Sequence, residues 1–278
     1  MIDAHQHFLD PARVDYPWMS GSYERLRRSF GPADLRPALD ALDVEQAIVV
    51  QASNSSDETV MLLRIAADDP RTSGVIGWVD LTDPAVGDVL ATLRCRPGGG
   101  GLVGIRHLVH DEPDPEWLLR PDVGRGLAAI ADAGLVFDLL VRQRELASAL
   151  TVVDRHPDLR FVVDHLAKPS IASGDLEPWA SLLRPFGLRD HVSVKLSGLV
   201  TEADWTAWTA TDLAPYVALA VEVFGPSRLM FGSDWPVCLL AASYDRVLEA
   251  LLEALGDLAG SDRKAILGGT ATRVYGLS

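Results

Sequence analysis

Two histidines lie close together near the start of the chain, in the segment M-I-D-A-H-Q-H-F. If this segment is a β-strand, His5 and His7 project from one face, about 6.6 Å apart along the backbone. Two imidazoles in this arrangement can converge on one metal ion or on one polarised carbonyl group. An isolated pair of this kind is more often structural, so the functional interpretation depends on polar residues later in the chain.

The elements that must position this pair alternate regularly between short apolar runs and longer helical segments. The apolar runs predict eight strands, over Ile2–His5, Gln46–Gln51, Gly74–Val79, Leu102–Arg106, Leu135–Val141, Arg160–Asp164, Val192–Leu196 and Arg228–Gly232. The segments between them predict helices over Asp34–Val44, Asp57–Asp68, Pro84–Cys95, Pro121–Ala133, Arg144–Arg155, Leu176–Phe186, Asp212–Phe224 and Ser243–Leu255. The connections are too long for hairpins, so the strands should be parallel.

Eight such units close naturally into one (β/α)₈ barrel, an α/β fold that we expect to span residues 1–278 as a single domain. An open doubly wound sheet is the alternative, but no G-x-G-x-x-G motif follows the first strand to mark a dinucleotide site. At the helix starts, Asp34 and Asp57 are predicted N-caps, and Pro84 and Pro121 are predicted to lie in first turns.

Composition and charge exclude several classes of function. The formal net charge of −14 disfavours nonspecific binding to nucleic acid or to acidic membranes, which requires clustered cations. Cys95 and Cys238 are too far apart in the sequence to indicate a disulfide framework or a cysteine metal site. No apolar run of 18 or more residues and no leader is present, so we expect a cytoplasmic protein whose partner is a small molecule. A homo-oligomer is compatible with the sequence.

In a barrel of this type, the functional residues lie at the carboxyl ends of the strands. Those ends are rich in polar side chains, namely His5, His7, Gln51, Trp78, Asp80, Arg106, His107, Asp164, His165, Lys195, Ser197, Ser233, Asp234 and Trp235. A random sample of strand ends would not concentrate polar groups in this way. This clustering predicts an enzyme.

Five motifs carry a resemblance to a known family. They are D-A-H-Q-H at the first strand, G-I-R-H at residues 104–107, D-H-L-A-K-P at 164–169, K-L-S-G-L at 195–199 and F-G-S-D-W-P-V at 231–237. Together they resemble the amidohydrolase superfamily, and within it the sugar lactonases of the L-fuconolactonase and L-rhamnonolactonase type. The resemblance implies a metal-dependent-hydrolase barrel that opens the ester ring of a sugar lactone in carbohydrate catabolism.

The resemblance assigns catalytic roles to Asp234, His165 and Arg106. A lactone hydrolase must activate a water, stabilise charge on the carbonyl oxygen and protonate the departing alkoxide. Asp234 is the expected general base, which can later return the proton. Arg106 is expected to bind the substrate and to polarise its carbonyl group with a fixed fork of donors.

The metal ligands implied by the resemblance are His5, His7, His165 and Asp234, a set of nitrogen and oxygen donors that suits one zinc-like divalent ion. Without a metal, the same imidazoles could donate hydrogen bonds directly to the carbonyl oxygen, so metal-independent catalysis stays open. The sequence departs from the members of the superfamily that bind two metal ions, because its fourth strand ends without a lysine and its fifth without a histidine. This difference argues against a two-metal centre.

The expected substrate contacts are indole rings, on which the C–H faces of sugars stack. Trp18 and Trp235 are predicted to bind substrate, and Trp78 is a further candidate. Trp18 belongs to a long first loop, residues 10–33, which we expect to act as a lid and to select the sugar.

Two alternatives to a lactonase remain: a metal-dependent decarboxylase of an aromatic or muconate-like acid, which would need more cations at the mouth than Arg106, and a catalytically silent binding barrel. His107 is predicted to be structural. Lys195 either points into the barrel near Asp234 or pairs with a carboxylate in the wall, and the pair is favoured. Lys168, in the loop after the sixth strand, either reaches the mouth or pairs with Asp164.

Overall fold

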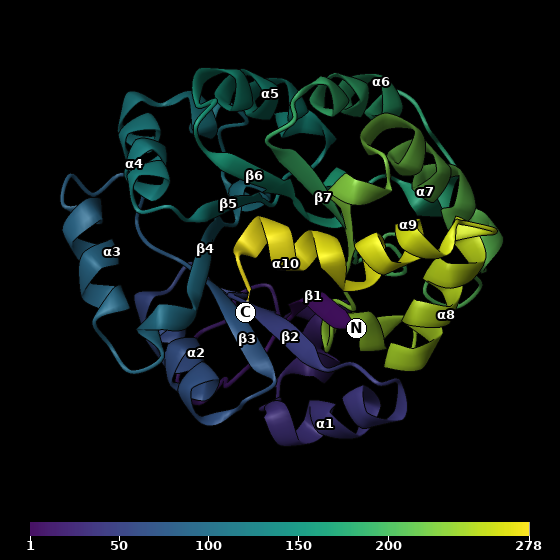
Figure 1. Cartoon of the computed structure of the whole chain (residues 1–278), viewed down its shortest axis with the longest axis horizontal. Coiled ribbons are helices and arrows are strands. Elements are labelled where there is room, and N and C mark those ends of the chain that lie inside the picture. The colour runs from purple at the N-terminus through teal and green to yellow at the C-terminus, as the bar shows by residue number, and fades with distance from the viewer. Residues whose placement is uncertain (278) are drawn as a thin grey trace.

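The computed structural model describes residues 1–277 and confirms the predicted barrel (Figure 1). Its eight strands are all parallel and lie in the order of the sequence. They are β1 (Ile2–Gln6), β2 (Gln46–Val50), β3 (Thr72–Gly77), β4 (Leu102–His107), β5 (Val136–Leu139), β6 (Arg160–Val163), β7 (Val192–Leu196) and β8 (Leu229–Phe231). A parallel bridge between Gln6 and Trp235 brings the end of β8 against β1, and the amide of His7 donates to the carbonyl of Trp235 at 2.6 Å.

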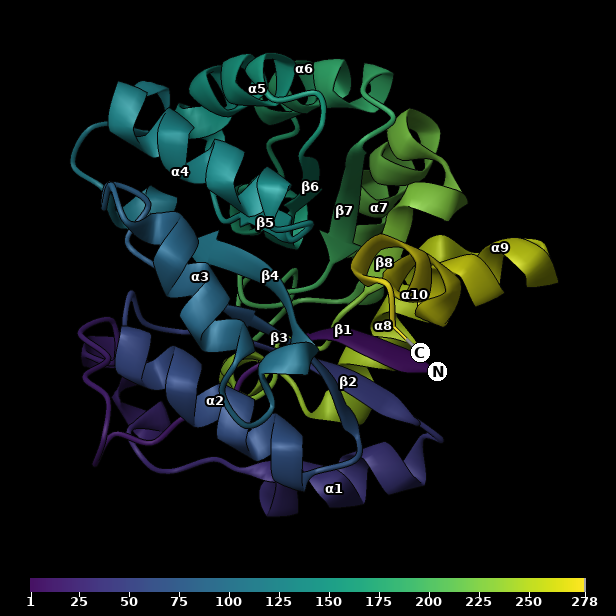
Figure 2. The same ribbon diagram turned by 60° about the vertical axis from the view of Figure 1, so that its left-hand side comes forward.

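Each predicted helix is present, and the helices form the outer layer of the barrel (Figures 1 and 2). They are α1 (Pro32–Ala41), α2 (Ser56–Asp68), α3 (Val86–Arg94), α4 (Pro121–Asp132), α5 (Leu146–Arg155), α6 (Trp179–Leu183), α7 (Ala210–Phe224) and α8 (Tyr244–Leu255). Two further short helices that the sequence did not predict, α9 (Gly260–Lys264) and α10 (Thr270–Tyr275), follow α8. The predicted helix over Leu176–Phe186 is shorter than expected and continues as a 3₁₀ helix over Arg184–Leu188.

Three of the four predicted helix starts are wrong in detail. Gly31 is the N-cap of α1, and the Asp34 carboxylate accepts a hydrogen bond from its amide at 2.9 Å, so Asp34 acts from the third helical position. Ser55 caps α2 and accepts from the amide of Glu58 at 3.3 Å, which leaves Asp57 in the first turn. The helix predicted to begin near Pro84 begins at Val86, whereas Pro121 is the first residue of α4 as expected.

The interior of the barrel is filled in layers. The lowest layer is apolar and is closed by α10, which lies across the end of the barrel in Figure 1. Its members are Ile2, Ala4, Ile48, Val50, Ile76, Val136, Val162 and Met230 from the strands, with Ala271, Val274 and Tyr275 from α10. Above it, the next inward positions of the strands carry charged side chains, and the polar strand ends follow at the mouth.

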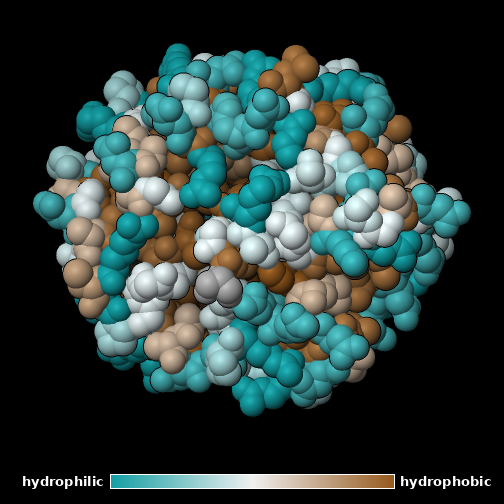
Figure 3. Space-filling model, viewed as in Figure 1, coloured by the Kyte–Doolittle hydropathy of each residue, from teal (hydrophilic) through white to brown (hydrophobic). Residues whose placement is uncertain are grey.

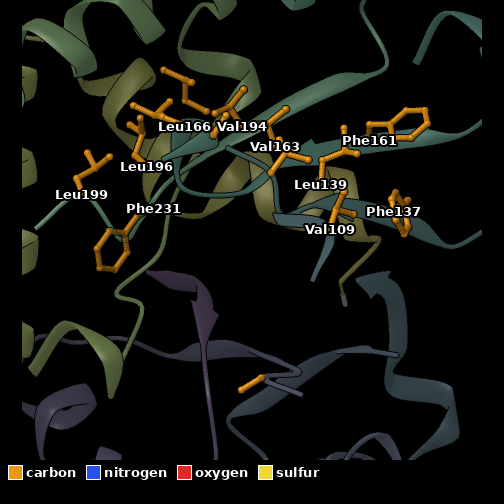
Figure 4. Packing of buried hydrophobic residues seen from close by; sticks show 14 of the residues in the cluster. Val109, Phe137, Leu139, Phe161, Val163, Leu166, Val194, Leu196, Leu199 and Phe231 are labelled. Carbon is orange, nitrogen blue, oxygen red and sulfur yellow. The ribbon is translucent and has the colours of Figure 1, made fainter. Parts of the chain in front are cut away.

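A separate and larger apolar core joins the outer faces of the strands to the helices. Figure 4 shows part of it along β5 to β8, where Phe137, Phe161 and Phe231 lie among aliphatic side chains. Because these strands are covered on both faces, their sequences are continuously apolar, as the runs A-I-V-V and F-V-V indicate. This rigid wall fixes the strand ends that carry the polar residues.

The surface seen in Figure 3 is hydrophilic over most of its edge, and hydrophobic residues show mainly near the middle of that face. Among residues 1–277, no helix combines the length and the hydropathy that crossing a bilayer requires.

Candidate active site

His5, in β1, and His7, directly after it, converge at the mouth of the barrel. The strand register shifts between Asp3 and Gln6. This irregularity changes the alternation of the strand, so that Ala4 packs in the apolar layer while His5 contacts the inward-facing charged residues. The Nε2 atoms of His5 and His7 lie 3.3 Å apart. Burial lowers the pKa of His5 well below its ordinary value, which keeps this imidazole neutral.

Asp3, which precedes this pair, anchors β1 to the end of β8. Its carboxylate accepts hydrogen bonds from the amides of His5 and Ser233 at 3.0 and 2.9 Å, and from the hydroxyl of Tyr244 at 3.0 Å. Burial raises the pKa of Asp3 to about 6, although these donors favour its charged form. Asp3 therefore fixes the backbone that carries His5 opposite the backbone that carries Asp234.

Asp234 faces the histidines from the loop after β8. Its backbone has a φ of 58°, in the left-handed region, and its amide donates to the carbonyl of His5 at 2.8 Å. Its Oδ1 atom lies 3.2 Å from His7 Nε2 and 3.8 Å from His5 Nε2. Burial alone would raise the pKa of Asp234, but His165, His7 and Lys168 hold it below its usual value. The carboxylate is thus ionised and able to accept a proton.

His165 reaches the same place from an unusual turn after β6. Residues 165–168 all have φ between 51° and 57°, which is costly for residues with side chains and is tolerated where the surroundings fix it. His165 Nδ1 lies 2.8 Å from the hydroxyl of Ser197, and Nε2 lies 4.0 Å from Asp234 Oδ1. A Cβ atom on Gly198 would lie 2.5 Å from the imidazole, so only glycine leaves room for it.

His5, His7 and Asp234 lie close enough together to hold one divalent metal ion, and His165 Nε2 lies 4.0 Å from the Asp234 carboxylate. His7 Nδ1 is 2.7 Å from the carbonyl of Val50, to which it can only donate, so Nε2 keeps its lone pair and faces the Asp234 carboxylate. His7 Nε2 and Asp234 Oδ1 are both acceptors and lie 3.2 Å apart, so a cation or a proton is required between them. Donor atoms bound to one zinc ion at 2.0–2.1 Å in a tetrahedral arrangement are about 3.4 Å apart, close to the spacings in this cluster.

Arg106 lies at the bottom of the cavity, but its donors are largely committed to the protein. Its Nη1 atom donates to Asp164 Oδ2 at 2.9 Å and lies 3.3 Å from His5 Nε2. Its Nη2 atom donates to the backbone and side-chain oxygens of Gln51. Only Nε is without a partner among the described residues. The prediction of a free guanidinium fork for the carbonyl group is therefore modified: both terminal nitrogens are paired with protein groups, and Nε is buried.

A buried charged layer supports the histidines from below. Lys195 contacts Asp138, lies 3.1 Å from Asp164 Oδ1 and lies 3.2 Å from His5 Nδ1. The hydroxyl of Tyr275 in α10 donates to Asp138 at 3.0 Å. All these groups are buried, and the two carboxylates are balanced by Lys195 and Arg106. The predicted pairing of Lys195 with a carboxylate in the wall is confirmed.

A cavity of about 280 Å³ opens above this cluster. Its lining includes predicted site residues, namely His7, Trp18, Arg106, His165 and Asp234. It also includes residues to which the sequence analysis gave no site role, namely Tyr23, Ala52, Leu108, His110, Asp111, Leu140, Arg142, Lys168, Thr201 and Val237. Most of the second group come from loops, for which apolar periodicity gives no signal. His110 received no role, yet burial and the cations Lys168 and Arg142 lower its pKa to about 3, so a neutral imidazole lines the cavity.

Two tryptophans that were predicted to contact the substrate, Trp235 and Trp78, do not line the cavity. Trp235 is buried and packs edge-on against Phe8 and Phe30, because its backbone pairs with β1 and turns the ring toward the first loop. Trp78 donates to His107 Nδ1 at 3.0 Å outside the cavity lining. His107 also stacks on Trp117 with ring centroids 4.1 Å apart, which agrees with the structural role predicted for it.

The first loop supplies the aromatic wall. Trp18 donates to the carbonyl of Ala52 at 2.8 Å and contacts Tyr23 edge-on, and Tyr23 contacts Trp205 in the same way. The β2–α2 loop under Trp18 is held by Glu58, whose Oε2 atom accepts hydrogen bonds from the amides of Ala52 and Ser53 at 2.9 and 2.8 Å. Glu58 thus supports the wall from beneath.

Glu58 should make stability depend on pH. Burial raises its pKa from 4.5 to about 7, although the amides of Ser53 and Ala52 favour the charged form. A carboxyl group whose pKa is raised on folding stabilises the protein at low pH, and this contribution is lost as the pH rises through 7. Between pH 5 and pH 8, we expect the free energy of unfolding of wild type to fall by about 2–3 kcal/mol relative to that of Glu58→Gln. Urea unfolding of both proteins at each pH measures this difference. A constant difference across this range would contradict the assignment.

The fold and the site define the class of protein. The amidohydrolase family model matches residues 2–277, and the chain belongs to that family. An L-fucono-1,5-lactonase of Burkholderia multivorans is 41% identical over 99% of this chain and 96% of that protein. An L-fucono-1,5-lactonase of Burkholderia ambifaria is 37% identical over 99% of this chain and 94% of its own length.

A solved structure resembles this one over the whole chain. It is an amidohydrolase from Burkholderia multivorans with bound zinc, which superposes with a TM-score of 0.94 at 39% identity and covers 100% of this chain and 99% of its own. Together with the donor group of His5, His7 and Asp234, beside which His165 lies, this likeness supports a divalent metal ion in the present site.

Proposed function

We propose that this protein is a hydrolase that opens the ester ring of a neutral sugar lactone such as L-fucono-1,5-lactone. The observation that carries the proposal is the convergence of three imidazoles and one ionised carboxylate at the base of a small cavity with an aromatic wall. The activity of the two relatives, L-fucono-1,5-lactone hydrolysis, supports the same substrate class.

The side chains suit the steps of ester hydrolysis. Asp234 accepts a proton from the attacking water as the water oxygen bonds to the carbonyl carbon. Arg106 and His165 both line the cavity. They would stabilise the negative charge that develops on the carbonyl oxygen, Arg106 as a cation and His165 by a hydrogen bond when no metal ion occupies its Nε2 atom. The ring C–O bond then breaks, and Asp234 returns the proton to the departing oxygen. The product is an open-chain acid with one new hydroxyl group, while Trp18 and Tyr23 hold the sugar face.

His5, His7, His165 and Asp234 would hold one zinc-like ion, which when bound supplies a polarised carbonyl group and a water of lowered pKa. A second potential donor group consists of His5, Asp164 and His165. It shares His5 with the group of His5, His7 and Asp234, and its Asp164 is already paired with Lys195 and Arg106. These residues therefore favour a single ion over a two-metal centre.

The test is the rate of ring opening, measured by proton release, on a panel of five- and six-membered aldonolactones. We expect opening of L-fucono-1,5-lactone far above the buffer rate. Prolonged treatment with a tight chelator, followed by metal analysis, should lower this rate, and added zinc should restore it. Full activity in metal-free protein would show that the imidazoles act on the carbonyl group directly, whereas no opening of any lactone would reject the proposal.

A decarboxylase of an aromatic or muconate-like acid is less well supported. Such a substrate needs cations that are free to bind its carboxylates. Within residues 1–277, each cationic side chain that lines the cavity has a carboxylate partner, Asp164 for Arg106 and Glu202 for Lys168 and Arg142. The site therefore suits an uncharged substrate.

A further inference from the structure

Three strand-end loops bring two cations and one carboxylate together at the rim of the cavity. Lys168 follows β6 and Arg142 follows β5, and both line the cavity. Glu202 follows β7 and joins them: its Oε1 atom is 2.7 Å from Lys168 Nζ, and its Oε2 atom is 3.3 Å from Arg142 Nη1. Lys168 thus reaches the mouth, one of the two alternatives predicted for it. The other, a pair with Asp164, is wrong because Asp164 is turned inward to Arg106 and Lys195.

Glu202 is placed to act on the ligand without touching it. It is not part of the cavity lining, and its side chain is 13% exposed, close to the 14% of Lys168. The Lys168–Glu202 pair is therefore largely shielded from water, where charge-assisted hydrogen bonds are stronger than at an open surface, whereas the side chain of Arg142 is 46% exposed. Two cations that would attract an anion into the cavity are thus held and partly neutralised by one carboxylate behind them.

The other charged groups at the cavity also disfavour an anionic ligand. Asp111 and Asp234 also line it, and the third lining cation, Arg106, is paired with Asp164. A substrate carboxylate would have to displace Glu202 from Lys168 or Arg142, or lie beside it and be repelled. A neutral ligand with hydroxyl groups neither displaces Glu202 nor is repelled by it. It can accept hydrogen bonds from Lys168 and Arg142 while these cations stay paired with Glu202.

We propose that Glu202 is a specificity-determining residue, which selects neutral sugar lactones against lactones that carry a carboxylate by holding Lys168 and Arg142. This inference rests on the proposed lactonase function. In this proposal, a residue behind the cavity wall decides between neutral and anionic lactones, and its pairing with the two cations explains why the neutral ones are preferred.

The test compares two lactones that differ mainly in charge. L-Fucono-1,5-lactone is the neutral probe, and galactarolactone, in which a carboxylate replaces the methyl group, is the anionic probe. In Glu202→Gln, we expect the ratio of kcat/KM for the anionic over the neutral probe to rise by about tenfold or more, since hydrogen bonds to charged groups have about this effect. The gain should come from a lower KM for galactarolactone.

The matched control is Glu222→Gln, which removes the same charge from an exposed pair with Arg184. This variant should leave the ratio unchanged. Combining Glu202→Gln with Lys168→Met should reduce the gain, because one of the two freed cations is lost and Arg142 remains. Thermal unfolding checks that each variant is folded.

Arg142→Gln tests the proposal independently if Glu202→Gln folds poorly. It removes a cation and leaves Glu202 in place, so the ratio should fall below that of wild type. A ratio unchanged in folded Glu202→Gln, or an unchanged ratio in Arg142→Gln, would overturn the proposal. If wild type opens neither probe, the lactonase function itself fails, and the two failures are distinguishable.

Discussion

Asp234→Asn is expected to lower the turnover number for lactone opening by about 10²- to 10⁴-fold, the usual effect of removing a general base. The amide keeps the shape of the carboxylate and can still face His7 and His165, but it cannot take a proton from water. The rate should be measured by proton release at saturating lactone, so that the loss appears in kcat.

Asp204→Asn provides the matched control, because it removes a carboxylate from an exposed turn near Thr206. This control should keep the turnover of wild type. A folded Asp234→Asn variant with nearly full activity would contradict the role of Asp234 and would revive the interpretation of the chain as a binding protein.

Lys195→Met is expected to destabilise the protein by about 3–5 kcal/mol, because breaking a buried ion pair leaves an uncompensated charge. Asp138 and Asp164 are both fully buried, and after this change Arg106, the Tyr275 hydroxyl and the neutral imidazole of His5 would face them. For a chain of this size we expect a fall in the unfolding temperature on the order of 10 °C. Differential scanning calorimetry measures this directly.

Lys264→Met removes the same charge from the exposed surface of α9 and should change the unfolding temperature by no more than about a degree or two. Equal unfolding temperatures for the two variants would show that the buried charged layer contributes little to stability. In that case, the position of His5 would depend on strand packing alone.

The sequence was sufficient to predict the barrel and the residues that gather at its mouth. Continuous apolar runs such as A-I-V-V identify strands covered on both faces, and parallel strands bring their carboxyl ends to one edge. That is why His5, His7, His165 and Asp234 were predicted as neighbours although they are far apart in sequence. The short helices α9 and α10 were not predicted, because neither is long enough to show helical periodicity.

The details that the sequence did not predict depend on tertiary contacts. The register shift in β1 and the left-handed turn at residues 165–168 have no local sequence signature, since no glycine marks either of them. The choice of Glu202 over Asp164 as the partner of Lys168 depends on which way each strand end faces. Likewise, Trp235 was expected at the cavity, but pairing of its backbone with β1 turns the indole into the core.

The seam between β1 and β8 has a consequence for biosynthesis. His5 lies in the first strand and His7 directly after it, Asp234 follows the last strand, and the amide of Asp234 reaches the carbonyl of His5 only when these strands meet. A nascent chain that has not yet released β8 from the ribosome has no assembled acid–base pair, however well its earlier units have folded. If Asp234 is the general base, the protein can therefore become active only after the barrel has closed, and unfinished or misassembled molecules stay inactive.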